Sequence, residues 1–270
     1  MSCLCWQRMH VWLLLSLAGL TPCQAQIGFQ VSPAKIYINH SSTTEQTARL
    51  HLTNTMDKRL ILQATCADWR RDSAGTKVYY PAGTLPTSCC SVVRVTPTVI
   101  ELAPHEERDI LVTVLADASS GAGLLRNAMV LLTQVNEQET ASASRSSQFI
   151  IRVQIGVHVY VLPAESVQPD VAITGMKLSR SGDRYQVKVQ VANQGGTLLE
   201  SQLRVEYLNL ATMQEVKMEP MPVNTMPKEQ FNVTALVPDT LPKGKYLIVA
   251  ILDSGSGQPL KVAELETELK

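Results

Sequence analysis

The feature that most constrains this chain is the segment Gln148–Pro163, QFIIRVQIGVHVYVLP, in which apolar residues recur at every odd position. The even positions are mainly polar residues or glycine, with Ile150 and Leu162 as exceptions. Because side chains alternate faces along a strand, the segment predicts one strand with a fully apolar face. At about 3.3 Å per residue this strand would run roughly 45–50 Å, longer than the sheet of one small sandwich. Something else must cover part of its apolar face.

Two interpretations of this strand remain open at the level of its pattern. It is either the last strand of an ordinary β-sandwich that runs into a linker, or a strand with one end kept apolar so that it can be lent to a partner chain. The rest of the sequence has to decide between them.

The segments that precede this strand predict one all-β domain. Phe29–Asn39 is predicted as a strand interrupted at Pro33, and because proline cannot donate to the ladder, an edge strand or a switch between sheets is implied. Val92–Leu102 is predicted as a strand with a proline at Pro97. About seven short strands separated by turn signals are typical of an immunoglobulin-like sandwich. The other predicted strands are Thr47–Thr55, Arg59–Trp69, Arg108–Ala116 and Arg126–Asn136.

A second series of strands follows a short linker bounded by prolines, Ala164–Pro169. We therefore expect an all-β protein of two tandem immunoglobulin-like β-sandwich domains, at residues 26–163 and 170–270, whose angle the linker prolines would hold. The predicted strands of the second domain are Val171–Ser179, Arg184–Asn193, Ser201–Asn209, Met213–Pro220, Glu229–Val237, Gly244–Asp253 and Leu260–Leu269.

Residues 1–25 predict a secretory signal peptide. Arg8 supplies positive charge, Val11–Leu20 is an apolar core, and Ala25 is the small residue of a cleavage site. The apolar core is too short to anchor the chain in a bilayer, so we expect a soluble, exported protein with no stable membrane insertion. The alternative is a lipoprotein site at Cys23, which the preceding proline fits poorly.

Of the six cysteines, Cys66, Cys89 and Cys90 lie beyond the predicted signal peptide. An exported chain enters an oxidising compartment, where disulfides persist. A bridge from Cys66 to either Cys89 or Cys90 would close a loop of about 24 residues and contribute roughly 3 kcal/mol. The bridge would tie together the two ends of the polar segment Arg70–Ser88. The sequence does not decide which of the two cysteines pairs with Cys66. Zinc is the rival interpretation, but three cysteines without a fourth ligand or C-x-x-C spacing disfavour a metal site.

Composition and motifs give no positive support for catalysis or for nucleic-acid binding. Lys plus Arg and Asp plus Glu are equal at 24 each, so no charge bias indicates nucleic acid or an anionic membrane. No histidine has metal-ligand spacing to another histidine or cysteine, and G-x-S-x-G, H-E-x-x-H and Gly-rich phosphate loops are missing from the sequence. We expect no enzyme activity, no catalytic residues and no cofactor.

Taken together, these features resemble a known family. Tandem sandwiches after a signal peptide, an interrupted first strand, the segment VTPTVIELAPHEERDILVTV at Val95–Val114 and a long alternating strand that ends in proline are similar to the PapD-like periplasmic chaperones of pilus assembly. The resemblance covers the chain from about Phe29 onward, and the second domain matches only by size and strand pattern. It implies a periplasmic chaperone that binds pilus or fimbrial subunits by donor-strand complementation and delivers them to an outer-membrane usher.

In that family, the strand corresponding to Phe149–Ile155 lends its apolar side chains to a subunit whose own sandwich lacks its final strand. An incomplete sandwich exposes an apolar groove and unpaired backbone groups, and a lent strand covers both. Each buried side chain would contribute on the order of 1.5–3 kcal/mol before ordering costs. The donors that the resemblance implies are Phe149, Ile151, Val153 and Ile155.

The family also binds the subunit's C-terminal carboxylate with two basic residues in the cleft between the domains. The resemblance places these at Lys35, where arginine is typical, and at His158, where many members have lysine. A lysine holds a carboxylate as a point charge, and an unperturbed histidine is a minority cation at neutral pH. Three readings stay open: His158 is a neutral donor, Lys35 acts nearly alone, or the anchor differs. Leu162 replaces an arginine that often pairs between the domains, so apolar contact is expected to hold the domain angle.

The alternative function belongs to a different class. An exported two-domain sandwich could serve as a structural or adhesive component whose long strand pairs internally. The chaperone hypothesis fails if the first part of the long strand is sealed under its own domain without an open flank.

Overall fold

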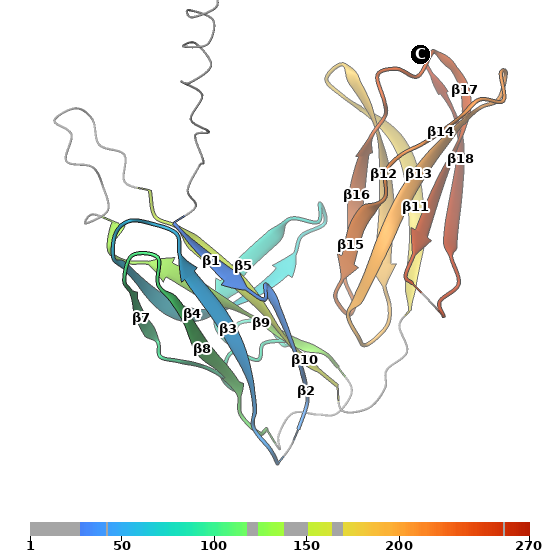
Figure 1. The fold of residues 1–270 in the computed structure, drawn as a ribbon. Helices are drawn as coiled ribbons and strands as arrows, with labels where there is room; N and C mark the ends of the chain where they lie inside the picture. Colours follow the sequence, from blue (N-terminus) through green and yellow to red (C-terminus); the bar gives the residue numbers. More distant parts are fainter. Residues whose placement is uncertain (1–27, 42, 118–123, 138–150, 164–169, 256) are drawn as a thin grey trace, which may run out of the picture.

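The computed structural model of the protein describes residues 28–41, 43–117, 124–137, 151–163, 170–255 and 257–270. Within these ranges the chain is all-β and forms two immunoglobulin-like sandwiches, as predicted (Figure 1). The predicted signal peptide and the predicted linker lie outside the described residues. Among the residues that the structure describes, no helix is long and apolar enough to cross a membrane.

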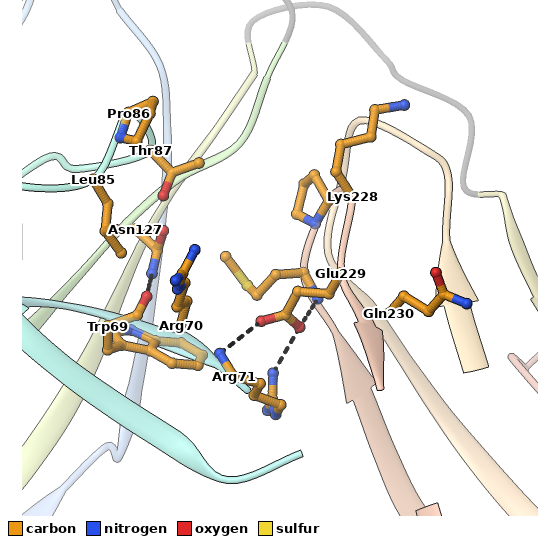
Figure 2. Close-up of a pocket in the computed structure, with 12 residues that line it drawn as sticks. Trp69, Arg70, Arg71, Leu85, Pro86, Thr87, Asn127, Lys228, Glu229 and Gln230 are labelled. Carbon is orange, nitrogen blue, oxygen red and sulfur yellow. Dashed lines mark hydrogen bonds and ion pairs between the residues drawn. The ribbon is translucent and has the colours of Figure 1, made fainter. Parts of the chain in front are cut away.

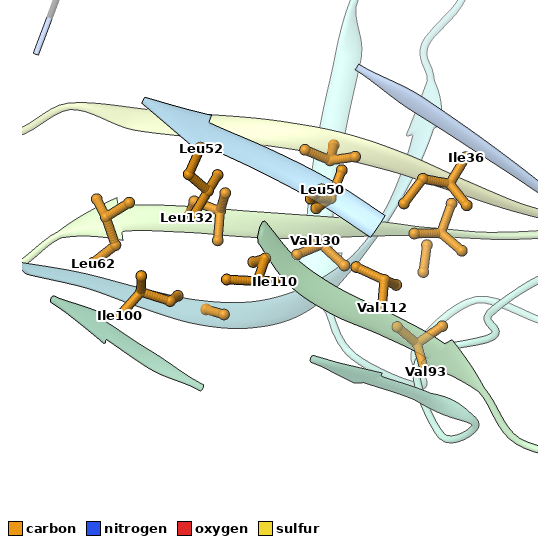
Figure 3. Packing of buried hydrophobic residues seen from close by; sticks show 14 of the residues in the cluster. Ile36, Leu50, Leu52, Leu62, Val93, Ile100, Ile110, Val112, Val130 and Leu132 are labelled. Carbon is orange, nitrogen blue, oxygen red and sulfur yellow. The ribbon is translucent and has the colours of Figure 1, made fainter. Parts of the chain in front are cut away.

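The N-terminal sandwich consists of two sheets, with strand orders β1-β3-β8-β6 and β2-β10-β9-β4-β5, and β7 pairs with β4 in the second sheet. The strands of the first sheet are β1 (Phe29–Ser32), β3 (Gln46–Asn54), β6 (Val93–Thr96) and β8 (Glu107–Val114). Those of the second are β2 (Lys35–Asn39), β4 (Leu60–Arg71), β5 (Lys77–Pro81), β7 (Val99–Leu102), β9 (Arg126–Gln134) and β10 (Gln154–Leu162). Aliphatic side chains from both sheets interdigitate to form the core, as Leu50, Ile110 and Val130 do in Figure 3.

Two prolines divide predicted strands and send the halves to different sheets. The Ser32–Pro33 bond is cis, and there the chain passes from β1 in the first sheet to β2 in the second. The predicted interruption at Pro33 is therefore confirmed as a sheet switch. The Thr96–Pro97 bond is also cis and separates β6 from β7. The prediction of one strand over Val92–Leu102 is wrong, because the ladder partner changes from β8 to β4 at this proline.

The polar segment Arg70–Ser88 contains a strand that the sequence did not predict. β4 continues to Arg71, the chain turns at Gly75 with φ of 84°, and β5 returns antiparallel with Lys77 opposite Arg71. A positive φ at this turn suits glycine, which has no Cβ. The resulting β4–β5 hairpin extends beyond the sandwich toward the C-terminal one (Figure 1).

The long alternating strand is shorter in the structure than its pattern predicts. β10 begins at Gln154, and the preceding Ile151–Val153 belong to no strand, although the backbone N–H of Gln134 donates a 2.9 Å hydrogen bond to the Val153 carbonyl. Residues 148–150 lie outside the described ranges. The prediction of a continuous strand is therefore wrong over Ile151–Val153, because the pairing of β10 with β9 starts only at Gln154, opposite Thr133.

The C-terminal sandwich also has two sheets, with strand orders β11-β12-β16 and β14-β13-β17-β18, and β15 pairs with β13 in the second. The predicted strand Met213–Pro220 is reduced to β14, and the sequence did not predict β15, which follows it; both pair with β13. The strands are β11 (Val171–Ser181), β12 (Arg184–Asn193), β13 (Leu199–Asn209), β14 (Glu215–Lys217), β15 (Met221–Thr225), β16 (Gln230–Leu236), β17 (Gly244–Asp253) and β18 (Lys261–Leu269).

The disulfide joins Cys66 of β4 to Cys90, with their Cα atoms 5.8 Å apart. This confirms a bridge from Cys66 and settles its partner, which the sequence left open. Cys89 is free and buried, and burial raises the pKa of its thiol to about 12. The Cys89 side chain therefore packs as a small apolar group in the N-terminal core.

Candidate functional site

β10 has one unpaired edge over Gln154–Val157. On one side β10 pairs with β9 throughout this segment. On the other side it pairs in parallel with β2, but only from the point where His158 lies opposite Lys35. Within the described part of the chain, the segment therefore has a strand neighbour on one side only. Such an edge presents backbone donors and acceptors to an incoming strand.

The edge is open because the chain before Pro33 belongs to the other sheet. β1 pairs only with β3 and forms an edge of the first sheet. The start of β1 still comes close to the beginning of the β10 segment, since a Cβ built on Gly28 would lie 3.8 Å from Val153 Cγ2. The edge of the first sheet and the free edge of β10 thus border the same opening of the sandwich.

The predicted donor residues differ in exposure along the chain. Ile151 is 75% exposed, whereas Val153 and Ile155 are half-buried and pack against the N-terminal core. Val157 is fully buried. Phe149 lies outside the described residues. The apolar face therefore emerges from its own core toward Ile151, and its first described part is not sealed under its own domain.

At the end of β10 an aromatic and apolar cluster lies where the two sandwiches meet. The rings of His158 and Tyr160 stack with centroids 5.6 Å apart, and the Trp69 ring meets that of His158 edge-on at 4.7 Å. Tyr160 and Trp69 belong to an apolar cluster that Met226 of the C-terminal sandwich completes, with Leu162 packed against it. Leu162 therefore takes part in an apolar contact where the sandwiches meet, and that this contact holds the domain angle stays a prediction.

Lys35, a predicted anchor residue, is already paired with a carboxylate. Its ammonium forms an ion pair with Glu200 of β13, and the Tyr37 hydroxyl donates a 2.9 Å hydrogen bond to the same carboxylate. The Lys35 hydrogen bond is the main cause that lowers the pKa of Glu200. Desolvation, and then Glu200, raise the pKa of Tyr37 to about 12. Glu200 is thus held as an anion on Lys35.

Arg71, in the β4–β5 hairpin, makes the second ion pair between the sandwiches. Its guanidinium lies 3.0 Å from the Glu229 carboxylate, and both side chains are 12% exposed. The guanidinium also lies over the ring of Phe231, 5.5 Å from its centroid. Beside it, the backbone N–H of Asn232 donates a 3.0 Å hydrogen bond to the Ser73 carbonyl. The hairpin is therefore docked on β16 and the turn before it.

Lys77 of β5 is the third cation of this cleft, and the sequence analysis did not identify it. Its ammonium lies 2.8 Å from Nε2 of His158, and among the described residues it has no acidic partner. Because an ammonium can only donate, Nε2 accepts and the proton of the neutral imidazole is on Nδ1. Nδ1 is buried and has no hydrogen-bond partner within the described structure. The run Lys77–Pro81, rich in Val and Tyr after a glycine turn, is the signal that could have revealed this strand.

The environment of His158 keeps its imidazole neutral. Burial is the main cause, followed by the charges of Lys77, Arg71 and Lys35, and together they lower the pKa of His158 to about 4. Partial desolvation and the neighbouring charges of Arg71 and Lys35 also lower the pKa of Lys77. At neutral pH, therefore, the cations of the cleft are lysines and an arginine, and His158 is not one of them.

A pocket of about 400 Å³ opens beside the Arg71–Glu229 pair, between β4 and the turn before β16 (Figure 2). On its inner wall Asn127 donates a 3.1 Å hydrogen bond to the Trp69 carbonyl. Lys228 lines its opposite wall. Among the described residues, no group of three or more His, Cys, Asp or Glu side chains is placed to hold a metal ion.

No protein-family profile matches the chain, and a comparison with curated protein sequences finds no match. Among solved structures, the CsuC–CsuE chaperone and tip subunit complex of Acinetobacter baumannii matches with 12% identity and a TM-score of 0.47, covering 88% of this chain and 98% of that one. The Salmonella enterica SafA pilin complex with the SafB chaperone matches with 11% identity and a TM-score of 0.46, covering 90% of this chain and 98% of that one. The E. coli chaperone DraB matches with 16% identity and a TM-score of 0.41, covering 89% of this chain and 98% of that one. At TM-scores below 0.5, these similarities carry no inference about function.

Proposed function

We propose that this protein is a PapD-like periplasmic chaperone that binds pilus or fimbrial subunits by donor-strand complementation and delivers them to an outer-membrane usher. The observation that carries the proposal is the free edge of β10 at Gln154–Val157, which continues into the exposed apolar side chain of Ile151.

A partner strand on this edge would lie in line with β2. β2 runs parallel to β10, and its ladder begins at the Lys35–His158 pair. An added strand that also ran parallel to β10 would meet the start of β2 with its C-terminal end. Its terminal carboxylate would then arrive among the cations of the cleft, which supports a carboxylate anchor at that end.

The apolar face of the same segment supplies the second half of the interaction. Ile151, Val153 and Ile155 alternate along one face, and the proposal adds Phe149 as the outermost donor. A subunit lacking a strand would gain backbone partners and apolar contacts at the same time. Because burying each large aliphatic side chain is worth about 1.5–3 kcal/mol, capture needs no nucleotide, cofactor or catalysis.

Export is part of this proposal. Residues 1–25 would act as a signal peptide cleaved near Ala25, and the two sandwiches would function as domains 26–163 and 170–270 in the periplasm. The chaperone would work there without stable membrane insertion and without nucleic acid.

The test is co-expression of the tagged protein with a pilus subunit that is insoluble on its own. The wild type should keep the subunit soluble and co-purify with it, whereas Ile151→Asp combined with Val153→Asp should abolish capture while both sandwiches stay folded. Leu260→Asp combined with Val262→Asp is the matched control, because these two residues are 56% and 54% exposed on the C-terminal sandwich. If the first double variant still holds the subunit, the strand is not lent, and a structural or adhesive role replaces the proposal.

A further inference from the structure

We infer, on the basis of the proposed function, that Lys77 of the β4–β5 hairpin, set against the neutral imidazole of His158, is the position that binds a partner's terminal carboxylate. Lys35 has a different role, because it is the partner of Glu200 within the chain.

The charges of the cleft single out Lys77. Lys35 is neutralised by Glu200 and Arg71 by Glu229, and both acids come from the C-terminal sandwich. Lys77 has no such acid within the described residues. An arriving anion would therefore meet a positive charge that no acid of the described chain already neutralises.

The hydrogen-bonding capacity of Lys77 also fits a carboxylate. An ammonium has three N–H donors, and the described contacts use one of them, toward Nε2 of His158. The two remaining donors are free to meet carboxylate oxygens. Because the Lys77 side chain is exposed to solvent, an anion can reach it without unfolding of the hairpin.

The position of Lys77 agrees with the end of the free edge. His158 is the first residue of β10 that pairs with β2, so it marks where an added strand must stop. The Lys77 ammonium lies at hydrogen-bonding distance from the side chain of that residue. A strand that filled the edge up to Val157 would therefore bring its terminal carboxylate toward Lys77.

The test uses sodium acetate as the probe, with acetamide as its uncharged counterpart at matched ionic strength. Of the chain's three tryptophans, Trp6 and Trp12 belong to the predicted signal peptide, so Trp69 fluorescence reports on the cleft of the exported protein. The Lys77 ammonium lies 5.5 Å from the centroid of the Trp69 ring, so binding there should change the fluorescence. The wild type should show a saturable response to acetate and none to acetamide.

Variants then assign the response to one lysine. Lys77→Met should weaken acetate binding about tenfold or more, as loss of a charge-assisted hydrogen bond predicts, and Lys77→Arg should restore most of it. Lys35→Met, and Lys245→Met as an exposed strand lysine outside the cleft, should stay within about twofold of the wild type. The inference is overturned if the wild type shows no saturable acetate response or if Lys77→Met binds acetate like the wild type. It is also overturned if Lys35→Met weakens acetate binding as much as Lys77→Met does.

The acetate experiment separates this inference from the proposed function. Acetate does not use the apolar edge, so Ile151→Asp combined with Val153→Asp should leave its binding unchanged. Loss of subunit capture in that double variant with intact acetate binding supports both proposals. Intact capture in the double variant would overturn strand lending without contradicting the Lys77 site. Loss of acetate binding in the same double variant would contradict an acetate site at Lys77 that does not depend on the apolar edge.

Discussion

The ammonium of Lys77 lies 2.8 Å from Nε2 of His158, and this contact joins the β4–β5 hairpin to the strand that the fold is built around. It places a lysine from a polar segment beside the residue that the resemblance puts in the anchor. Because the imidazole accepts this hydrogen bond, it is neutral, and the positive charge of the pair belongs to the lysine.

The first prediction concerns the pH dependence of stability. An unfolded histidine binds a proton below about pH 6.5, whereas His158 in the folded protein does so only near pH 4. Between these values the unfolded state binds more protons, so stability falls as the pH falls, by up to about 3 kcal/mol from this residue. Urea unfolding at pH 7 and pH 4.5 should show that the free energy of unfolding falls less between these pH values in His158→Asn than in the wild type. Equal losses would contradict the assigned environment.

The charge of Lys77 should be visible in the titration of His158. Lys77 is the second cause of the lowered pKa of His158, after burial, and Arg71 and Lys35 add to it. Lys77→Met should therefore raise the pKa of His158 above that of the wild type but leave it below the usual value of about 6.5, because burial remains. NMR titration of histidine-labelled protein measures this directly, and an unchanged pKa would show that the two groups do not interact.

Glu200→Gln should release Lys35 for an external anion. The variant keeps the size of the side chain but removes the charge that Lys35 and Tyr37 contact. We expect acetate to bind more tightly or at a second position, and we expect the pKa of Tyr37 to fall from about 12. Glu215→Gln, which breaks the exposed pair with Lys217, should behave like the wild type in the same fluorescence titration. A response in Glu200→Gln identical to that of the wild type would contradict the role given to Glu200.

The Arg71–Glu229 pair should contribute more to stability than an exposed pair. Both of its side chains are 12% exposed, so Arg71→Met leaves the Glu229 carboxylate largely buried without a counter-charge, held only by the backbone N–H groups of residues 71 and 226. We expect a loss of about 1–3 kcal/mol. Arg184→Met removes a pair whose side chains are 61% and 66% exposed, and it should cost less than about 1 kcal/mol. Calorimetric unfolding of the two variants provides the comparison, and a similar cost for both would argue against a docked hairpin.

The cysteines lead to a prediction about thiol chemistry. Cys66→Ser or Cys90→Ser should destabilise the oxidised protein by about 3 kcal/mol, whereas Cys89→Ala should leave the bridge intact. In the native protein without residues 1–25, a thiol reagent should find Cys89 unreactive, because it is buried with a raised pKa, and should find one thiol after unfolding. Loss of the disulfide in Cys89→Ala would show that the pairing is different.

Much of the fold was predictable because strand periodicity is local information. Alternation at Arg184–Asn193 and Gly244–Asp253 predicted β12 and β17 with the bounds that the structure has. Pro33 predicted an edge strand or a sheet switch, because a missing donor breaks a ladder wherever it occurs, and the structure shows the switch. The polar residues and turn signals around it hid β5 and its lysine, because the Val and Tyr run of this strand is short and none of its residues is fully buried.

The amino-acid sequence by itself determined the two sandwiches, the interrupted first strand and the apolar face that leads to Ile151. Tertiary structure alone decided which part of β10 is unpaired, which cysteine meets Cys66, and which cations have partners. Lys35 and Glu200 are 165 residues apart in the chain, so their pairing depends on how the sandwiches pack. The alternation of apolar and polar residues is a property of neighbouring residues in the chain. Strand register, ion pairing and desolvation arise only when strands that are distant in the sequence are brought together.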